Sequence, residues 1–561
     1  MPTSDKHFSD FLPPPSDRSF FMAPITTENF YKYILSLKPK GSLDDNNFSV
    51  CLISSVALPI SIPLAHIFNL SISSGIFPSH MKVSRCIPIY KSGSIFDIEN
   101  YRGIVIINAF NKVFEKIISD RLLDFLDTNN FLSKLQFGFR RKTSTTHAIT
   151  AILNTISQKL NEGNYVMIVL LDIKKCFDSL SRPILFKKLE NAGVRGIALD
   201  WFISYFLDRK QCTFVIGTSS LNILDILYGV LQGSVLGVLL FLIYINDLPE
   251  SCEILINFLF ADDDSAVIAA KNLIDLINSA NSEIYKLTQW YSSNLLTIHP
   301  GKTKCLVFRG PRTDLNLYEH EPSGKLYLPL FLNLNNSGEH DISKIIPINL
   351  VPNPTENSAC LLGILIDKKL SFKQHFNHLH NKVNKAIFSL RQMKHLLDKK
   401  HLTLLYNSYL KSAIEYGCLL FCCANKTSIK SISILQKKSI RILTNSGYRD
   451  HTAPLFAAEN LLTFNSLIFL NQARFMYDYT HNLLPPFFSN TWRTNDQVHI
   501  HALRNSKDIY LETINKPFVN CHPLYHFPKV WNSCPTAIRE STSRKIFVNK
   551  LTKYLLDFPI V

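Results

Sequence analysis

The sequence predicts a mixed α/β protein, because short runs of strand-forming residues alternate with segments of helical periodicity. Residues 165–171 form a continuous apolar run with no polar face, which is typical of a strand buried on both sides. The apolar runs 254–260 and 266–270 flank an Asp-rich break, and this pattern predicts two antiparallel strands joined by a tight turn. The helical signal is strongest over 273–290, where apolar residues recur at intervals of three and four.

Composition describes a globular, basic protein of several units. At about 150 residues per domain, a chain of 561 residues predicts three or four units. Hydrophobic residues make up 46% and charged residues 19%, which excludes a disordered chain. The 60 Lys and Arg residues outnumber the 44 Asp and Glu residues, giving a formal charge of +16. This surplus favours a polyanionic partner.

The 12 cysteines are scattered through apolar segments, which is expected in a reducing compartment. Two groups, around Cys418–Cys423 and at 521–534, lack the paired spacing of a zinc framework, so we interpret both as structural. Residues 1–15 contain no apolar signal core, and the longest apolar run, 235–245, is far shorter than the roughly 20 residues of a membrane span. We therefore expect an intracellular protein, nuclear or cytoplasmic or both, without a membrane segment.

The first third of the chain alternates helices, one strand and basic loops. A Pro-rich leader to about residue 25 precedes helices that flank a break at 38–45. A strand at 86–90 ends at Lys91, and a helix over 113–126 follows. The loop 136–144 mixes aromatics with Arg140, Arg141 and Lys142, and leads into a helix ending near 160. That loop is equally compatible with phosphate binding and with an exposed solubilising turn.

The middle of the chain supplies further strands and turns. The apolar run 165–171 ends at Asp172, and a glycine-punctuated turn at 228–237 opens into a helix over 238–246, where glycines let a ligand approach the backbone. After the helix at 273–290, a strand at 296–298 and a turn at 299–304 lead into a strand at 305–308.

The last part is predicted to be mostly helical. We interpret 309–358 as an irregular insertion and 361–367 as a strand. A helix beginning at 376 has Lys382 and Lys385 outside its apolar face, which is compatible both with a surface that tracks a nucleic-acid backbone and with a solvated basic flank.

The acids Asp262, Asp263 and Asp264 stand at the predicted hairpin tip. Adjacent carboxylates repel one another by about 1 kcal/mol in water and about 4 kcal/mol at an effective dielectric of 20, and a divalent cation would relieve this repulsion. Alone, the tip is equally compatible with a solvated turn. Asp172 ends another strand and could converge with Asp262 and Asp263 across a sheet. Such a set suits two magnesium ions about 3.5–4 Å apart and the chemistry of nucleotidyl transfer.

These motifs, in this order, resemble the reverse transcriptase of non-LTR (LINE-type) retrotransposons of the jockey-like or CR1-like kind. The matching stretches are Lys91, residues 100–103 (NYRG), 136–140 (QFGFR), 171–172 and 177–178, 232–237 (QGSVLG), 260–263 (FADD), 302–303 and 362–367. Each stretch is unspecific by itself, but the occurrence of all of them in the order found in the family is specific.

The resemblance implies a right-hand polymerase with fingers and palm over 71–368 and a helical thumb over 369–450. An N-terminal leader and helical extension over 1–70 precedes these, and a mostly helical C-terminal region over 451–561 follows. The implied activity is RNA-directed DNA polymerisation, which extends a DNA primer on an RNA template with deoxynucleoside triphosphates and two Mg²⁺ ions, or Mn²⁺ in their place.

Roles follow from the matching positions. Asp172, Asp262 and Asp263 would hold the metal ions, and Lys302 matches a lysine proposed to protonate the departing pyrophosphate. The residues implied to bind the nucleotide are Lys91, Arg102, Gln232, Gly233 and Phe177, the last of which would lie under the sugar and exclude a 2′-hydroxyl. The residues implied to contact template and primer are Arg140, Lys142, Lys382 and Lys385.

Four positions depart from the family pattern, namely Gly103, Val238, Asp264 and His299. Asp264 adds a charge beside the implied metal site, and His299 stands in the turn that presents Lys302. These departures, and the lack of a recognisable endonuclease domain, motivate an alternative: a weakly active or inactive nucleic-acid-binding remnant, truncated or separately encoded. A group II intron maturase and an RNA-dependent RNA polymerase share the palm. The C-terminal region, which is similar to that of LINE elements, disfavours the first, and Phe177 disfavours the second.

Overall fold

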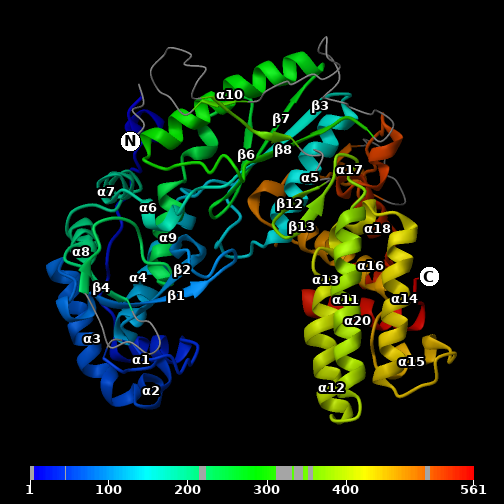
Figure 1. Cartoon of the computed structure of the whole chain (residues 1–561), viewed down its shortest axis with the longest axis horizontal. Coiled ribbons are helices and arrows are strands. Elements are labelled where there is room, and N and C mark those ends of the chain that lie inside the picture. The colour runs from blue at the N-terminus through cyan, green and yellow to red at the C-terminus, as the bar shows by residue number, and fades with distance from the viewer. Residues whose placement is uncertain are drawn as a thin grey trace.

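The computed structural model describes residues 6–44, 46–213, 223–310, 331–333, 345–350, 358–498 and 506–560. Figure 1 shows the N-terminal elements, coloured blue to green, on one side of the molecule and the C-terminal helices, coloured yellow to red, on the other. β3 (Tyr165–Leu171) and β7 (Asp263–Ala270) lie near the top of the view beneath α10 (Leu273–Ser293), whereas β1 (Val83–Tyr90) and β2 (Tyr101–Ile107) lie among the N-terminal helices. The mixed α/β fold class is therefore confirmed.

A five-stranded sheet carries the predicted acids. Its strands lie in the order β11 (Asn349–Leu350), β8 (Lys304–Phe308), β3 (Tyr165–Leu171), β7 (Asp263–Ala270) and β6 (Ile256–Phe260). β3 pairs antiparallel with β7 and β8, and β6 and β7 form the predicted hairpin. Leu171, the last residue of β3, lies opposite Asp264. This register brings Asp172 and the hairpin tip to the same edge of the sheet.

Two helices cover the opposite faces of this sheet. Alternate residues of β3 point to opposite sides: Val166 and Ile168 join the core that contains α5 (Thr145–Asn161), while Met167 and Val169 join the core that contains α10 (Leu273–Ser293). The prediction of a strand buried on both sides is confirmed. Each such side chain contributes about 1.5–3 kcal/mol through burial, so the edge that carries the acids is strongly supported.

A second, four-stranded sheet lies in the N-terminal half. Its order is β2 (Tyr101–Ile107), β1 (Val83–Tyr90), β4 (Lys210–Thr213) and β5 (Ile223–Asp225). The helices around it are α1 (Thr27–Ser36), α2 (Val50–Ser55), α3 (Ala57–Ser74), α4 (Ala109–Thr128), α6 (Cys176–Ser179), α7 (Arg182–Asn191), α8 (Ile197–Phe206) and α9 (Val235–Tyr244). Within the described residues, α3 is the helix with the length and hydropathy that a membrane crossing requires. Its buried face packs against α1 and α8.

The C-terminal half is helical from α11 (Lys373–Met393) onward. The further helices are α12 (Lys399–Leu405), α13 (Ser412–Glu415), α14 (Lys426–Leu443), α15 (Thr452–Ala458), α16 (Phe464–Thr480), α17 (Asn495–Val498), α18 (Pro523–Ser533), α19 (Thr536–Arg539) and α20 (Arg544–Asp557). Residues before and after 450 share one hydrophobic core, which also includes α5. The domain boundaries at 70, 368 and 450 stay predictions.

Several local predictions were wrong in detail. Residues 296–298 form only an isolated bridge, between Ile298 and Ile173, and not a strand. Residues 361–367 are not one strand, because the backbone turns back at Leu362 and Gly363, both with positive φ, to form the hairpin of β12 (Ala359–Leu361) and β13 (Ile364–Ile366). The helix expected over 238–246 begins at Val235, where Ser234 caps it. Most of the 309–358 segment falls outside the described residues; its described parts include β9 (Phe331–Asn333), β10 (Ile345–Pro347) and β11.

His375 makes the fold sensitive to acid. It lies in the first turn of α11 with 5% of its surface exposed, and its Nδ1 accepts a hydrogen bond of 3.4 Å from the Leu365 amide. Burial, together with the nearby positive groups of His378 and Lys382, lowers the pKa of His375 from 6.5 to about 4. Protonation of His375 is more favourable in the unfolded chain than in the folded one. The free energy of unfolding is therefore unaffected by this group above about pH 6.5, and it decreases by up to ~3 kcal/mol as the pH falls toward 4.

We therefore expect a His375→Gln variant, which keeps a hydrogen-bond acceptor but does not titrate, to lose less thermal stability than the wild type between pH 7 and pH 5. Melting temperatures measured across this range check the result. His401→Gln, at an exposed position, serves as the control and should follow the wild type. If the melting temperatures of His375→Gln and the wild type fall equally between pH 7 and pH 5, the prediction is contradicted.

Candidate active site

The three predicted metal ligands line one cavity of about 390 Å³. Four of the other predicted site residues line it too. The predicted residues in its wall are Lys91, Arg102, Asp172, Gln232, Asp262, Asp263 and Lys302. They come from the five-stranded sheet, the end of β1, the strand β2 and the turns before α9 and β8, so segments far apart in sequence meet here.

The carboxylates are close enough to influence one another's ionisation. The pKa of Asp263 is raised to about 6, mainly by burial and further by the negative charges of Asp262 and Asp172. Asp262 Oδ2 also accepts a hydrogen bond of 3.3 Å from the Cys176 thiol, and burial together with Asp262 raises the pKa of that thiol. Asp172 and Asp262 are half-buried and Asp263 is exposed. Such a cluster of carboxylates fits divalent cations, which prefer oxygen ligands and remove this repulsion.

A tight, strained turn presents Asp262. β6 and β7 pair up to Phe260 and Asp263, which leaves Ala261 and Asp262 as the turn. Ala261 has a φ of 55°, a left-handed conformation that costs a non-glycine residue about 1–2 kcal/mol. Such a conformation persists only where the surroundings hold it in place.

The segment 136–138 holds this turn. The side-chain oxygen of buried Gln136 accepts hydrogen bonds from the amides of Gly138, at 2.7 Å, and Ala261, at 3.0 Å. A Cβ on Gly138 would lie 2.2 Å from the Ala261 nitrogen, so only glycine allows this approach. The stretch 136–138 is therefore a backbone support for the acids.

We expect Gln136→Met, which keeps the size but removes the acceptor, to lower stability by about 1–3 kcal/mol, because two buried amides lose their partner. The rate of the polymerisation that the sequence motifs imply should fall by more than the loss of folded protein accounts for. The Mg²⁺ concentration that gives the half-maximal rate should rise. Titrating Mg²⁺ in primer-extension assays measures this shift. An unchanged metal dependence would show that Gln136 supports only the fold.

Asp264 does not lie at the site. It is 2% exposed, and its Oδ2 accepts a hydrogen bond of 3.0 Å from Tyr291 on α10. Because side chains alternate along β7, Asp264 points to the face opposite Asp263. The expectation that it adds a charge beside the metal ions is wrong in this respect: its carboxyl is buried in the core, where burial raises its pKa to about 7.

The turn containing His299 brings Lys302 to the acids. The His299 amide donates to the Asp172 carbonyl at 2.8 Å, and the His299 carbonyl accepts from the amides of Lys302 and Thr303 at 3.1 Å. Lys302 Nζ then lies 3.3 Å from Asp172 Oδ2. Main-chain bonds close this turn, so the departure at His299 leaves Lys302 at the site.

A chain of polar contacts forms the opposite wall. Arg102 Nε donates to Gln232 Oε1 at 3.2 Å, and Gln232 Nε2 donates to Asp178 Oδ2 at 3.1 Å. Burial raises the pKa of Asp178, while Gln232, Lys175 and Arg102 oppose this effect. Gly233 has a φ of 119°, and a Cβ there would lie 2.7 Å from the Val105 carbonyl oxygen. The backbone at Gly233 therefore packs directly against β2.

Phe177 lies beneath the surface of the cavity. Its ring stacks on Phe241 with centroids 4.8 Å apart, and 8% of the residue is exposed. It is not among the residues that line the cavity. Its role under the sugar stays a prediction.

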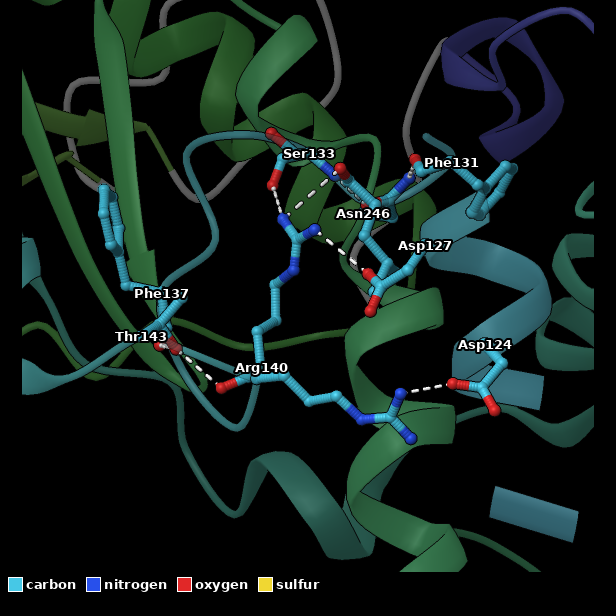
Figure 2. Close-up of polar contacts among 10 residues, drawn as sticks. Asp124, Asp127, Phe131, Ser133, Phe137, Arg140, Thr143 and Asn246 are labelled. Atoms are coloured by element: carbon cyan, nitrogen blue, oxygen red, sulfur yellow. Dashed lines mark hydrogen bonds and ion pairs between the residues drawn. The ribbon is translucent and has the colours of Figure 1, made fainter. Parts of the chain in front are cut away.

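Arg140 departs from its predicted role. As Figure 2 shows, its guanidinium is directed into the protein, where Nη1 donates to the Ser133 carbonyl at 2.8 Å and Nη2 lies 3.2 Å from Asp127 Oδ1. Its neighbour Arg141 pairs with Asp124. Because these acids on α4 and the Ser133 carbonyl occupy the two guanidinium groups, Arg140 links the loop to α4 and does not present its charge to a template.

The remaining predicted template contacts are exposed lysines. Lys142 ends the basic loop, and Lys382 and Lys385 lie on α11. None of the three lines the cavity, and their contacts with nucleic acid stay predictions.

Among the cavity residues that were given no role from the sequence, two make side-chain contacts with predicted site residues. Cys176 contacts Asp262, and Asp178 accepts from Gln232. Both follow Asp172 within a few residues, and Asp178 was part of a matching motif. Only the short helix α6, which turns the chain back over the cavity, brings them to the site.

Residues 89–346 match the model of the reverse transcriptase (RNA-dependent DNA polymerase) family. The chain is 23% identical over 464 residues to the RNA-directed DNA polymerase from mobile element jockey of Drosophila melanogaster, an alignment that covers 79% of this chain and 46% of that protein. It is 26% identical over 489 residues to the probable RNA-directed DNA polymerase from transposon BS of the same fly, covering 83% of this chain and 50% of the relative.

The chain thus spans about half the length of the curated relatives that it matches. The matched residues include Asp172, Asp262 and Asp263, and residues from several of the matching motifs line the same cavity. Residues 89–346 therefore form a reverse transcriptase domain, and the chain is homologous over most of its length to the RNA-directed DNA polymerases of jockey-type non-LTR retrotransposons.

Proposed function

We propose that this protein is an RNA-directed DNA polymerase of a non-LTR retrotransposon, which extends a DNA primer on an RNA template. One observation carries the proposal: Asp172, Asp262 and Asp263 converge from two neighbouring strands into a cavity that basic residues also line. Deoxynucleoside triphosphates, template RNA and a DNA primer or target DNA are the proposed substrates. The formal charge of +16 favours binding of the two nucleic acids.

The three aspartates would hold two Mg²⁺ ions, or Mn²⁺ in their place. When bound, such ions lower the pKa of the attacking hydroxyl and neutralise charge on the transferred phosphate. The pKa of Asp263, which is raised mainly by burial and further by the neighbouring carboxylates, supports this assignment, because bound cations favour the ionised form.

The other cavity residues would bind the nucleotide. Lys91 and Arg102 would contact the triphosphate from the N-terminal sheet, and Gln232 with the adjoining Gly233 would line the nucleotide pocket. Lys302, whose Nζ lies 3.3 Å from Asp172 Oδ2, would donate a proton to the departing pyrophosphate. Lys142, Lys382 and Lys385 would contact template and primer outside the cavity.

We also propose that the protein acts in the nucleus, the cytoplasm or both. All 12 cysteines are free thiols, which suits a reducing compartment.

Primer extension tests the proposed activity directly. The full chain, given a DNA primer annealed to an RNA template, should incorporate deoxynucleotides when Mg²⁺ is present and stop when the metal is chelated. Salt-dependent binding of the primer–template without synthesis would instead support the alternative of a non-catalytic binding remnant. The departures at Gly103 and Val238 motivate that alternative.

Phe177→Ala tests sugar discrimination. Removing the ring opens space beneath the nucleotide, and we expect ribonucleotide incorporation to rise relative to deoxynucleotide incorporation. The ratio of kcat/KM for the two substrates measures the effect. Phe241→Leu alters the stacking partner but keeps Phe177. It therefore separates exclusion of the 2′-hydroxyl by Phe177 from a general loss of packing around the nucleotide. An unchanged ratio in Phe177→Ala would remove Phe177 from the nucleotide site.

A further inference from the structure

Three potential metal ligands meet far from the cavity. One ligand atom from each of Cys423, Cys521 and His522 lies within 4.8 Å of the others. Cys423 ends the 3₁₀ helix η7 (Cys418–Cys423), and Cys521 ends η9 (Pro517–Cys521), directly before α18. The group around Cys418–Cys423 and the group at 521–534 each lack paired spacing in the sequence, but the fold brings members of both groups together.

A further thiol adjoins this group. Cys423 Sγ also donates to the Cys521 carbonyl at 3.4 Å, and the thiol of the adjacent residue, Cys422, donates to the Leu420 carbonyl at 3.7 Å. Two thiols and one imidazole are therefore gathered at one place, with a third thiol on the adjacent Cys422, and all three cysteines are free of disulfide bonds. Thiolate and imidazole ligands favour zinc over magnesium, and four such ligands form a typical structural zinc site.

The imidazole of His522 is held in one orientation. His522 is 4% exposed, and its Nδ1 lies 2.7 Å from Ser157 Oγ on α5. Because Ser157 Oγ donates its proton to the Leu153 carbonyl at 2.5 Å, it accepts from His522, and Nδ1 carries the hydrogen. The lone pair is then on Nε2. A hydrogen bond to the second ring nitrogen commonly orients metal-binding histidines in this way.

We propose that Cys423, Cys521 and His522 bind a structural zinc ion, with Cys422 as the fourth ligand. The ion would join η7 to the start of α18, and through Ser157 it would tie both to α5. α18 packs on α5 and η7, and α5 covers the sheet that carries the acids. The site would thus anchor the C-terminal region to the reverse transcriptase domain.

Metal analysis of the full chain tests this proposal. Protein purified under reducing conditions and dialysed against buffered zinc should retain about one zinc ion per chain, as expected for a single structural site. Substitution with Co²⁺ should produce the near-ultraviolet absorption of cobalt–thiolate bonds. Cys423→Ser and Cys521→Ser should lose both signals.

Matched controls should keep the zinc. His526→Gln alters a histidine one turn further along α18 that is not in the ligand group, and Cys212→Ser removes a half-buried thiol whose partner is the Ser84 carbonyl. Asp262→Asn should also retain zinc, so the result does not depend on the polymerase function. Where a serine variant does not fold, alkylation of the thiols of the wild-type protein is measured instead. Bound zinc should protect Cys423 and Cys521 from alkylation.

The proposal is overturned if the wild type binds no zinc, or if the Cys423 and Cys521 variants keep it. A mass lower by two hydrogens in nonreduced protein, with Cys423 linked to Cys521, would also overturn it, because the pair would then be a disulfide.

Discussion

Asp262→Asn is expected to lower the rate of primer extension at least about 10³-fold, because losing a metal ligand removes several kcal/mol of transition-state stabilisation. The substitution keeps the shape of the side chain and its position in the β6–β7 turn, so the fold should persist. Single-turnover extension at saturating nucleotide measures the loss, and fluorescence anisotropy should show unchanged primer–template binding.

Asp264→Asn provides the matched control on the same hairpin. Asp264 points to the opposite face and accepts a hydrogen bond from Tyr291, which an asparagine oxygen can also accept. Activity comparable to that of the wild type is expected. Equal losses in the two variants would mean that the hairpin is sensitive to any substitution, and full activity in Asp262→Asn would remove the metal site from the proposed function.

Asp247→Ala is expected to destabilise the N-terminal half by about 3–5 kcal/mol, the range found when one partner of a buried ion pair is removed. Lys188 Nζ on α7 lies 2.8 Å from Asp247 Oδ1 and donates to the Tyr244 carbonyl at 2.6 Å, and both charged side chains are only 3% exposed. Burial lowers the pKa of Lys188 and raises that of Asp247, so each charge depends on the other.

The neighbouring lysine supplies the control for this pair. Lys187 and Glu190 form an ion pair at 3.0 Å whose side chains are 66% and 46% exposed, and Glu190→Ala should change stability by less than about 1 kcal/mol. Denaturant unfolding can be followed by tryptophan fluorescence, to which Trp290, with its ring centroid 4.9 Å from Lys188 Nζ, contributes. The double variant Lys188→Met/Asp247→Leu should recover much of the loss. A loss in Asp247→Ala no greater than that in Glu190→Ala would contradict the prediction.

The basic loop shows how local sequence can mislead. Arg140, Arg141 and Lys142 suggested a phosphate site, yet two of these charges pair with acids on α4. The acids lie more than ten residues earlier in the chain, and no periodicity links them to the loop. Gln136, in contrast, matched a family motif without an assigned chemistry, and its role in holding Ala261 depends on a contact across 125 residues.

Amino-acid order alone determined the main strands, the amphipathic helices and the identity of the acids at the strand ends. These features follow from hydrophobic periodicity and turn chemistry, which act between residues close in sequence. Tertiary structure decided which charges face the cavity, since one step along β7 separates a proposed metal ligand, Asp263, from a core carboxyl, Asp264. It also decided that Cys423 meets Cys521 and His522, because packing of α18 against η7 and α5 brings together residues that no local pattern relates.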